Sequence, residues 1–208
     1  MNDYNKMLII SGPSGAGKST ICKYLVERFP DIYLSISSTT RAKREGETEG
    51  KEYFFVSEEE FKRGIANNEF LEWANVHGNY YGTSLVNIQK AIDKDKVILF
   101  EIDVQGFNSI KKIYPKAFSA FITTKNIETL RSRLEFRHSE SEAIIDKRLK
   151  NALKEMQEVS KFEYLVINED IEESKKALYC IIKSLYYVNS ANISFSLTQN
   201  WQINIKDV

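Results

Sequence analysis

Gly12-Pro13-Ser14-Gly15-Ala16-Gly17-Lys18-Ser19 follows the apolar run Met7-Leu8-Ile9-Ile10 and precedes apolar residues at helical spacing. The stretch matches the pattern G-x-x-x-x-G-K-S/T, in which glycines let consecutive backbone N–H groups point inward toward an anion. The next helix directs its positive N-terminus to the same place. A glycine-rich turn without a ligand is the alternative, but the preceding strand and the following helical pattern agree with a phosphate loop.

Two side chains of this loop have specific predicted roles. Lys18 reaches the β- and γ-phosphates of a nucleoside triphosphate, and the hydroxyl of Ser19 is a ligand of Mg²⁺. The loop therefore predicts Mg²⁺ as the cofactor. The predicted nucleotide-binding residues of the loop are Gly12, Pro13, Ser14, Gly15, Ala16, Gly17, Lys18, Ser19 and Thr20.

The composition is that of a globular protein without a strongly charged partner. The 208 residues include 29 Lys and Arg and 29 Asp and Glu, so nothing in the net charge indicates nucleic acid or a membrane surface. No run approaches the about 18 apolar residues of a membrane span, and no leader pattern opens the sequence, so we expect a cytoplasmic protein. Cys22 and Cys180 are expected to be buried free thiols.

Apolar runs that read as strands alternate with helical patterns, which predicts an α/β fold with a doubly wound parallel sheet. The predicted strands are 7–11, 32–37, 97–103, 118–122 and 164–167, and the predicted helices are 18–29, 127–135, 142–159 and 171–187. We assign residues 1–36, 91–132 and 160–188 to the core of a single domain, 133–159 to a short helical lid, and 189–208 to a polar, β-leaning tail.

Residues 37–90 interrupt the alternation and are predicted to form an inserted lobe. Residues 37–50 are polar and charged, so we expect a loop outside any core. Strands are expected at 53–56, 70–76 and 79–83, Ser57 and Glu60 fit a capping box, and residues 85–92 fit a helix.

Six of the eight arginines fall in two short stretches, which favours a local phosphate site because Arg presents a rigid fork for bidentate contacts. Taken alone, the first stretch is more commonly a solvated loop, and the second fits surface ion pairs. The six are Arg41, Arg44, Arg131, Arg133, Arg137 and Arg148.

From about Leu8 to Tyr187 the sequence resembles the guanylate kinases, P-loop enzymes that phosphorylate GMP. The resemblance rests on S-x-S-x-T-T-R-x-x-R-x-G-E at 35–47, G-x-x-Y-F-F-V at 50–56, N-x-E-F-L-E-W-A at 67–74, G-N-Y-Y-G-T at 78–83 and I-D-V-Q-G at 102–106. It implies ATP as donor and GMP or dGMP as acceptor.

Base selection follows from the residue types. Guanine presents two donors, N1–H and an amine, beside the acceptor O6, and an ionised carboxylate only accepts, so Glu72 and Asp103 suit guanine and oppose adenine. The hydroxyls of Ser37 and Thr83 are placed to donate to O6. The resemblance implies that Arg41, Arg44, Tyr53 and Tyr81 hold the phosphate of GMP.

The resemblance also assigns residues to the donor side. Arg137 and Arg148 are implied to bridge the donor and acceptor phosphates, Arg133 to lie near the donor, and Asn168 to lie near its base. Asp103 is predicted to order the waters of the metal, and Glu101 is a second candidate. The predicted catalytic residues are Lys18, Arg41, Arg137 and Arg148.

Other functions fit parts of the sequence. Asp103-Val104-Gln105-Gly106 also fits the D-x-x-G of a GTPase, but no N-K-x-D follows it. Another nucleoside monophosphate kinase and a non-catalytic guanylate kinase-like module stay open, although the intact loop favours an enzyme. Lys43, Phe136 and His138 depart from the family pattern in the acceptor loop and the lid, both histidines are expected at surface turns, and the oligomeric state is left open.

Overall fold

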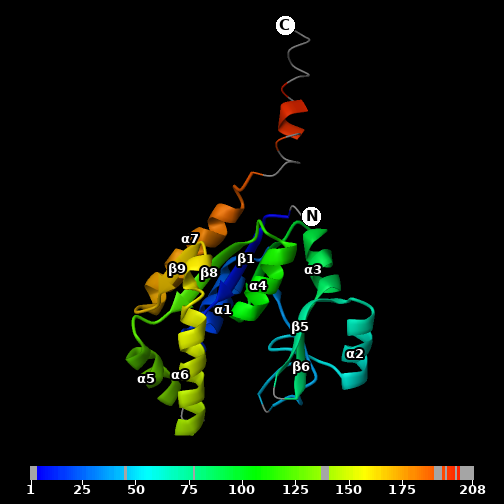
Figure 1. Cartoon of the computed structure of the whole chain (residues 1–208). Coiled ribbons are helices and arrows are strands. Elements are labelled where there is room, and N and C mark those ends of the chain that lie inside the picture. The colour runs from blue at the N-terminus through cyan, green and yellow to red at the C-terminus, as the bar shows by residue number, and fades with distance from the viewer. Residues whose placement is uncertain are drawn as a thin grey trace.

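The computed structural model describes residues 4–44, 46–76, 78–136, 141–189, 194, 196–199 and 201. Within these residues a parallel sheet has the strand order β2-β7-β1-β8-β9 (Figure 1). Apolar runs supply these strands, as expected where both faces of a sheet are covered. The predicted doubly wound parallel sheet is confirmed. Its strands are β1 (Met7–Ser11), β2 (Ile32–Ser35), β7 (Val97–Glu101), β8 (Phe118–Thr123) and β9 (Tyr164–Ile167).

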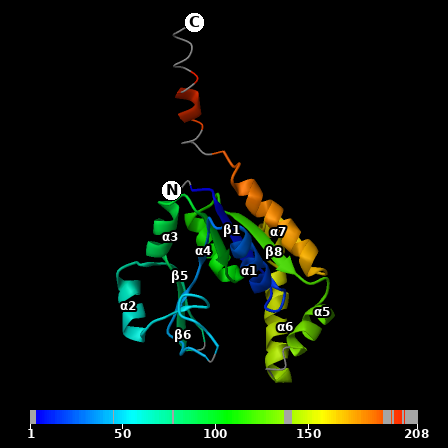
Figure 2. The ribbon, with the colours of Figure 1, turned by 180° about the vertical axis from the view of Figure 1, so that it is seen from behind.

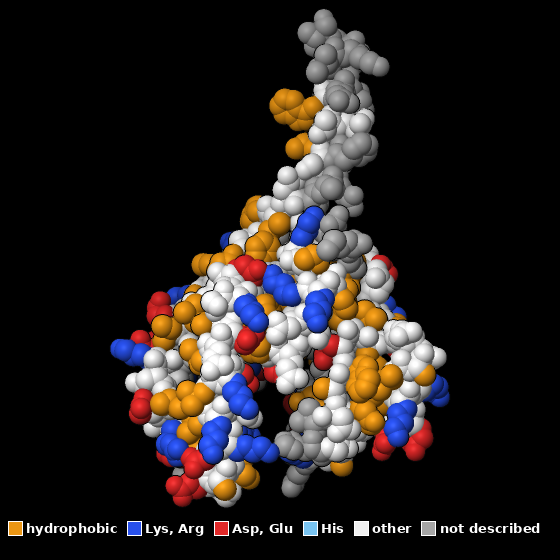
Figure 3. All heavy atoms as spheres, viewed as in Figure 1, with side chains coloured by type: hydrophobic (Ala, Val, Ile, Leu, Met, Phe, Trp, Pro, Cys, Tyr) orange, Lys and Arg blue, Asp and Glu red, His pale blue; other side chains and the backbone are white. Residues whose placement is uncertain are grey.

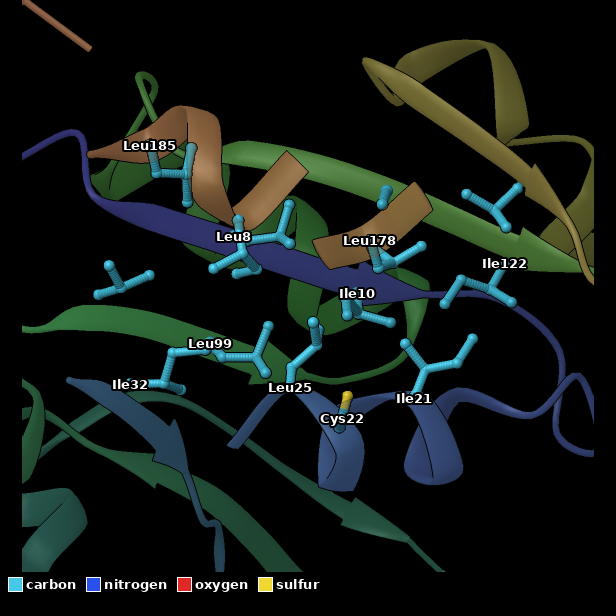
Figure 4. Packing of buried hydrophobic residues seen from close by; sticks show 14 of the residues in the cluster. Leu8, Ile10, Ile21, Cys22, Leu25, Ile32, Leu99, Ile122, Leu178 and Leu185 are labelled. Atoms are coloured by element: carbon cyan, nitrogen blue, oxygen red, sulfur yellow. The ribbon is translucent and has the colours of Figure 1, made fainter. Parts of the chain in front are cut away.

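One face of this sheet is covered by α1 (Lys18–Arg28) and α7 (Ile171–Leu185). Side chains alternate along a strand, so Leu8 and Ile10 of β1 both point to this face. Figure 4 shows Leu25 of α1 and Leu178 of α7 reaching the same cluster. Burying one such side chain contributes roughly 1.5–3 kcal/mol, so the cluster fixes the helix that begins at the phosphate loop.

The opposite face is covered by α3 (Leu85–Ile92) and α4 (Val104–Ile113). Helix α4 is absent from the sequence prediction. The signal for it is an N-cap, because Asp103 Oδ1 accepts a hydrogen bond from Gly106 N (2.8 Å), followed by buried Val104, Phe107 and Ile110. This cap holds Asp103 at the carboxyl end of β7.

The inserted lobe contains a second sheet with strand order β4-β3-β6-β5 and one helix, α2 (Figure 2). The capping box of Ser57 and Glu60 opens α2 as predicted. Phe61 of α2 stacks on Phe70 (4.2 Å between ring centroids) and on Tyr80 (5.3 Å), which ties the helix to the lobe sheet. The elements are β3 (Ser38–Thr39), β4 (Phe54–Phe55), α2 (Glu58–Ala66), β5 (Phe70–Val76) and β6 (Asn79–Ser84).

A helical pair, α5 (Ile127–Glu135) and α6 (Glu142–Met156), precedes the short helix η1 (Val159–Lys161). Leu130 and Leu134 of α5 form a small buried cluster with Ile145 and Leu149 of α6. The guanidinium of Arg131, expected at the surface, links the two helices through Asp146 (2.5 Å). The pair therefore packs as one unit of its own beside the sheet.

One expectation about the stretch 37–50 and one about a cysteine were wrong. Ser38 and Thr39, expected in a loop outside any core, form buried β3, because their backbone groups pair with β4 and β6. Cys22 is buried as expected, but Cys180 is exposed on α7.

The tail, predicted as β-leaning, is helical at its described residues 194, 196–199 and 201 and lies apart from the body in both ribbon views (Figures 1 and 2). A chain segment without a neighbouring strand satisfies its backbone groups by local bonds. Thr198 Oγ1 donates to Ser194 O (2.8 Å) in this way. Among the described residues, no helix is long and apolar enough to cross a membrane.

Candidate nucleotide-binding site

The loop between β1 and α1 depends on glycine at two close approaches. Gly12 has φ +128°, and a Cβ there would lie 2.0 Å from the carbonyl oxygen of Ile122 in β8. Gly17 has φ +99°, and a Cβ there would lie 2.4 Å from Asn168 Nδ2. Any other residue would be strained at both positions. The loop therefore lies directly against β8 and the end of β9, outside the carboxyl ends of the strands where α/β folds bind ligands.

Lys18 folds back across this loop. Its Nζ donates to Gly12 O (2.5 Å) and to Pro13 O (3.0 Å). Burial lowers the pKa of Lys18, and the carboxylates of Glu101 and Glu155 act in the opposite direction. The ammonium group is thus held at the loop by two carbonyl oxygens.

Ser19, the predicted metal ligand, has a carboxylate partner that differs from the main prediction. Its hydroxyl donates to Glu101 Oε1 (2.5 Å) at the end of β7, whereas Asp103 caps α4. Hydroxyl and carboxylate oxygens suit a hard divalent cation. The described residues hold no group of three or more His, Cys, Asp or Glu able to bind a metal ion. A cation here would take its other ligands from phosphates and water.

A pocket of about 580 Å³ lies beside the loop. Arg133 lines it, and its Nη2 donates to the carbonyl oxygen of Asn168 (2.6 Å). The buried side chain of Asn168 makes two hydrogen bonds within the protein. Its Nδ2 donates to Ala16 O (2.7 Å), and its Oδ1 accepts from Ser174 Oγ (3.0 Å). Asn168 thus lies at the pocket, but its amide supports the loop.

Helix α6 contributes a second arginine. Arg148 of α6 donates from Nη1 to Ser14 Oγ (3.3 Å), so α6 reaches the phosphate loop directly. Thr20 follows Ser19 in the first turn of α1 and is exposed. Arg137, predicted to be catalytic, lies outside the described residues, as do His77 and His138.

In the lobe, Arg41 and two tyrosines come together. The guanidinium carbon of Arg41 lies 5.5 Å from the centroid of the Tyr53 ring, and the Tyr53 and Tyr81 rings meet edge to face at 5.7 Å. Arg41 also forms an ion pair with Glu47 (2.7 Å), a residue to which sequence reasoning gave no role although it ends the motif at 35–47. The side chain of Arg44 is exposed, and its backbone N–H donates to Glu47 Oε2 (2.8 Å).

The predicted base-reading residues lie on adjacent strands. Glu72 of β5 is opposite Thr83 of β6, and Thr83 Oγ1 donates to Glu72 Oε1 (2.6 Å). The hydroxyl expected to face guanine O6 is thus engaged by Glu72. Burial raises the pKa of Glu72, the bond from Thr83 lowers it, and the charge of Asp103 raises it further. Ser37 is half-buried just before β3.

Glu101 connects the two halves of this arrangement electrostatically. Its charge acts on the pKa of Lys18 at the loop and, to a smaller extent than burial, on the raised pKa of Tyr53 in the lobe. Figure 3 shows the molecule hollowed between the part that carries α5 and α6 and the lobe. The loop, which holds Lys18, and the lobe, which holds Arg41, therefore each offer a candidate anion site.

Comparisons with known proteins agree with this arrangement. The family model of guanylate kinase matches residues 4–185. A guanylate kinase from Helicobacter pylori is 55% identical over 186 residues, which cover 89% of this chain and 90% of the relative. One from Helicobacter hepaticus is 51% identical over 196 residues, which cover 94% of this chain and 98% of the relative.

A solved structure of a guanylate kinase has a fold similar to that of this chain. The crystal structure of guanylate kinase from Anaplasma phagocytophilum matches with a TM-score of 0.70 and 34% identity, covering 88% of this chain and 87% of that chain. The matched family region contains the phosphate loop, the lobe and helices α5 and α6. The chain therefore belongs to the guanylate kinase family.

Proposed function

We propose that this chain transfers the γ-phosphoryl group of ATP to GMP, giving ADP and GDP, and accepts dGMP as well. The observation that carries the proposal is that the chain holds two places suited to phosphate, the loop with Lys18 and Ser19, and the cluster of Arg41, Tyr53 and Tyr81 in the lobe. Donor and acceptor phosphates bound at these two places would be neighbours, as an in-line transfer requires.

ATP is assigned to the loop and the pocket beside it. Backbone N–H groups of the loop and the ammonium of Lys18 bind its phosphates, Arg148 approaches from α6, and Arg133 lines the pocket for the base. Asn168 supports this half by fixing Ala16. We include Arg137 as a second bridging arginine on the strength of the family resemblance.

The proposed cofactor is Mg²⁺, which the family's need for a divalent cation and the oxygen donors at Ser19 support. Ser19 would hold the ion directly, and Glu101 and Asp103 would hold its waters. When bound, the ion neutralises charge on the β- and γ-phosphates. The protein's own task is to orient the ion through the hydroxyl of Ser19.

Replacing Glu101 by glutamine tests this assignment of the metal side. Because the amide keeps the shape but loses the charge, we expect the Mg²⁺ concentration for half-maximal activity to rise about tenfold. The KM for GMP should change little. Titration of Mg²⁺ at fixed ATP measures the effect, and an unchanged Mg²⁺ requirement would remove Glu101 from the metal site.

GMP is assigned to the lobe. Glu72 and Asp103 accept from the donor edge of guanine, Ser37 and Thr83 supply hydroxyls, and Arg41, Arg44, Tyr53 and Tyr81 hold the phosphate. The attacking phosphate oxygen is already anionic at neutral pH, so the reaction requires no general base. Closure of the lobe (37–90) and the lid (133–159) over both nucleotides would exclude water and prevent ATP hydrolysis.

An assay of ADP release with ATP and a panel of monophosphates tests the proposal. GMP should be turned over rapidly and dGMP should also react, whereas AMP, CMP and UMP should leave ADP release at the level without acceptor. Turnover of AMP or UMP with GMP inert would identify a different monophosphate kinase. Binding of GMP without any ADP release would identify a non-catalytic module.

A further inference from the structure

Glu47 is built into the turn that carries the acceptor-side arginines. Its Oε1 accepts from Arg41 Nη2 (2.7 Å), and its Oε2 accepts from Arg41 Nη1 (3.1 Å) and from the backbone N–H of Arg44 (2.8 Å). Its own N–H donates to Arg44 O (3.2 Å). The Arg41 and Glu47 side chains are only 13% and 17% exposed. The pair is therefore a fixed, bidentate one.

The contacts of Arg41 use one edge of its guanidinium. Nη1 donates to Ala42 O (2.7 Å) and to Glu47, and one N–H of Nη2 donates to Glu47. Arg has five N–H donors in a planar fork, so Nε–H and the second N–H of Nη2 are the pair that Glu47 and Ala42 do not use, and the side chain of Tyr81 also hydrogen-bonds to Arg41. Those two N–H groups form the second bidentate edge, which fits two oxygens of a phosphate.

Aromatic rings hold the plane of the same guanidinium. Its carbon lies 5.5 Å from the centroid of Tyr53 and 5.7 Å from that of Phe55, and Tyr81 stands beside Tyr53. Rings at these distances restrict the tilt of the guanidinium plane of Arg41. The hydrogen bonds to Glu47 restrict rotation of the guanidinium within that plane. These contacts together therefore fix the direction of the second edge.

We infer that Glu47 is a positioning residue. It holds the Nη1 and Nη2 end of the Arg41 guanidinium, so that the edge formed by Nε and Nη2 is oriented to bind the phosphate of the acceptor nucleotide. The inference rests on the proposed function, because it takes GMP as the ligand of Arg41. In the alternative role, the carboxylate of Glu47 is a stand-in for the phosphate: it occupies the phosphate's place on Arg41 and moves away when GMP binds. The backbone bonds between Glu47 and Arg44 favour the fixed role.

The two roles predict opposite changes in the full-length protein when Glu47 is replaced by alanine. A positioning residue supports binding of GMP in both ground and transition states, so its loss should raise the KM and Kd for GMP about 10- to 100-fold. The kcat and the KM for ATP should each stay within about threefold. Glu47→Gln, which keeps one acceptor oxygen, should lie between, and Glu47→Asp should recover part of the affinity.

Glu52→Gln is the matched control, because Glu52 lies in the same loop, is exposed, and accepts a backbone N–H bond from Thr48 (2.7 Å) without contacting an arginine. Steady-state kinetics for each substrate, calorimetric titration with GMP and thermal melts complete the experiment. Tighter GMP binding by Glu47→Ala would establish the stand-in role, and equal weakening of ATP and GMP would indicate a merely structural one. If the alanine variant fails to fold, the GMP affinity of Glu47→Gln alone distinguishes the positioning role from the stand-in role.

These outcomes separate from a failure of the proposed function. Absence of GMP turnover in the wild-type protein would overturn the function, whatever the variants do. Normal wild-type turnover, with GMP affinity in Glu47→Ala equal to that of Glu52→Gln, would overturn the positioning role alone.

Discussion

Replacing Lys18 by alanine is expected to lower the kcat for GDP formation on the order of 10³- to 10⁴-fold. The ammonium is held at the phosphate loop by Gly12 O and Pro13 O, so its charge stays where the phosphates of the donor are proposed to bind. Fixed positive charge placed where charge develops is the main help that an enzyme gives to phosphoryl transfer. The KM for GMP should change far less, because the acceptor contacts lie in the lobe.

The control is Lys23→Ala, which removes an exposed lysine from the same helix. Both variants should fold, because neither lysine belongs to the buried cluster around Leu8 and Leu25. Thermal melts and steady-state kinetics measured side by side separate a loss of chemistry from a loss of structure. A Lys18→Ala enzyme with kcat within tenfold of the wild type would contradict the role assigned to this residue.

The sequence predicted the fold well where one periodic pattern spans a whole element. The apolar runs of β1 and β7 have no competing interpretation, because a buried parallel strand is the structure that such short runs favour. Prediction failed where pairing partners decide the outcome. Ser38 and Thr39 are polar, and they form a buried strand because β4 and β6 lie on either side of them.

The sequence predicts which residues form the site, but it does not predict the contacts that those residues make in the structure. Motif spacing indicates that Ser19, Glu72 and Arg41 serve nucleotides, because those residue types suit cations, guanine edges and phosphates. It does not indicate that Ser19 meets Glu101, or that Glu47 holds Arg41. These partners are brought together from separate segments or around a tight turn, and their distances are fixed only by the folded chain.

Replacing Glu72 by glutamine is expected to lower kcat/KM for GMP by about 10³-fold, since a site built to pair polar groups rejects a mismatched one strongly. The carboxylate already accepts from Thr83 at Oε1 and has further lone pairs for N1–H and the amine of guanine. Glutamine would turn an N–H₂ group toward one of those donors. Glu69→Gln is the control, because Glu69 is an exposed carboxylate just before the same strand and accepts from Asn67 Nδ2 (3.0 Å).

The ionisation of Glu72 also predicts how kcat/KM for GMP changes with pH. Burial is the largest cause of the raised pKa of Glu72, and only the ionised form accepts from both guanine donors. In the wild type, kcat/KM for GMP should therefore fall as the pH decreases through that raised pKa, and should level off above it. Glu72→Gln should lack this acid limb, while both proteins keep the titration of the nucleotide phosphates. An identical acid limb in the variant, or kcat/KM within tenfold of the wild type, would show that another residue reads the base.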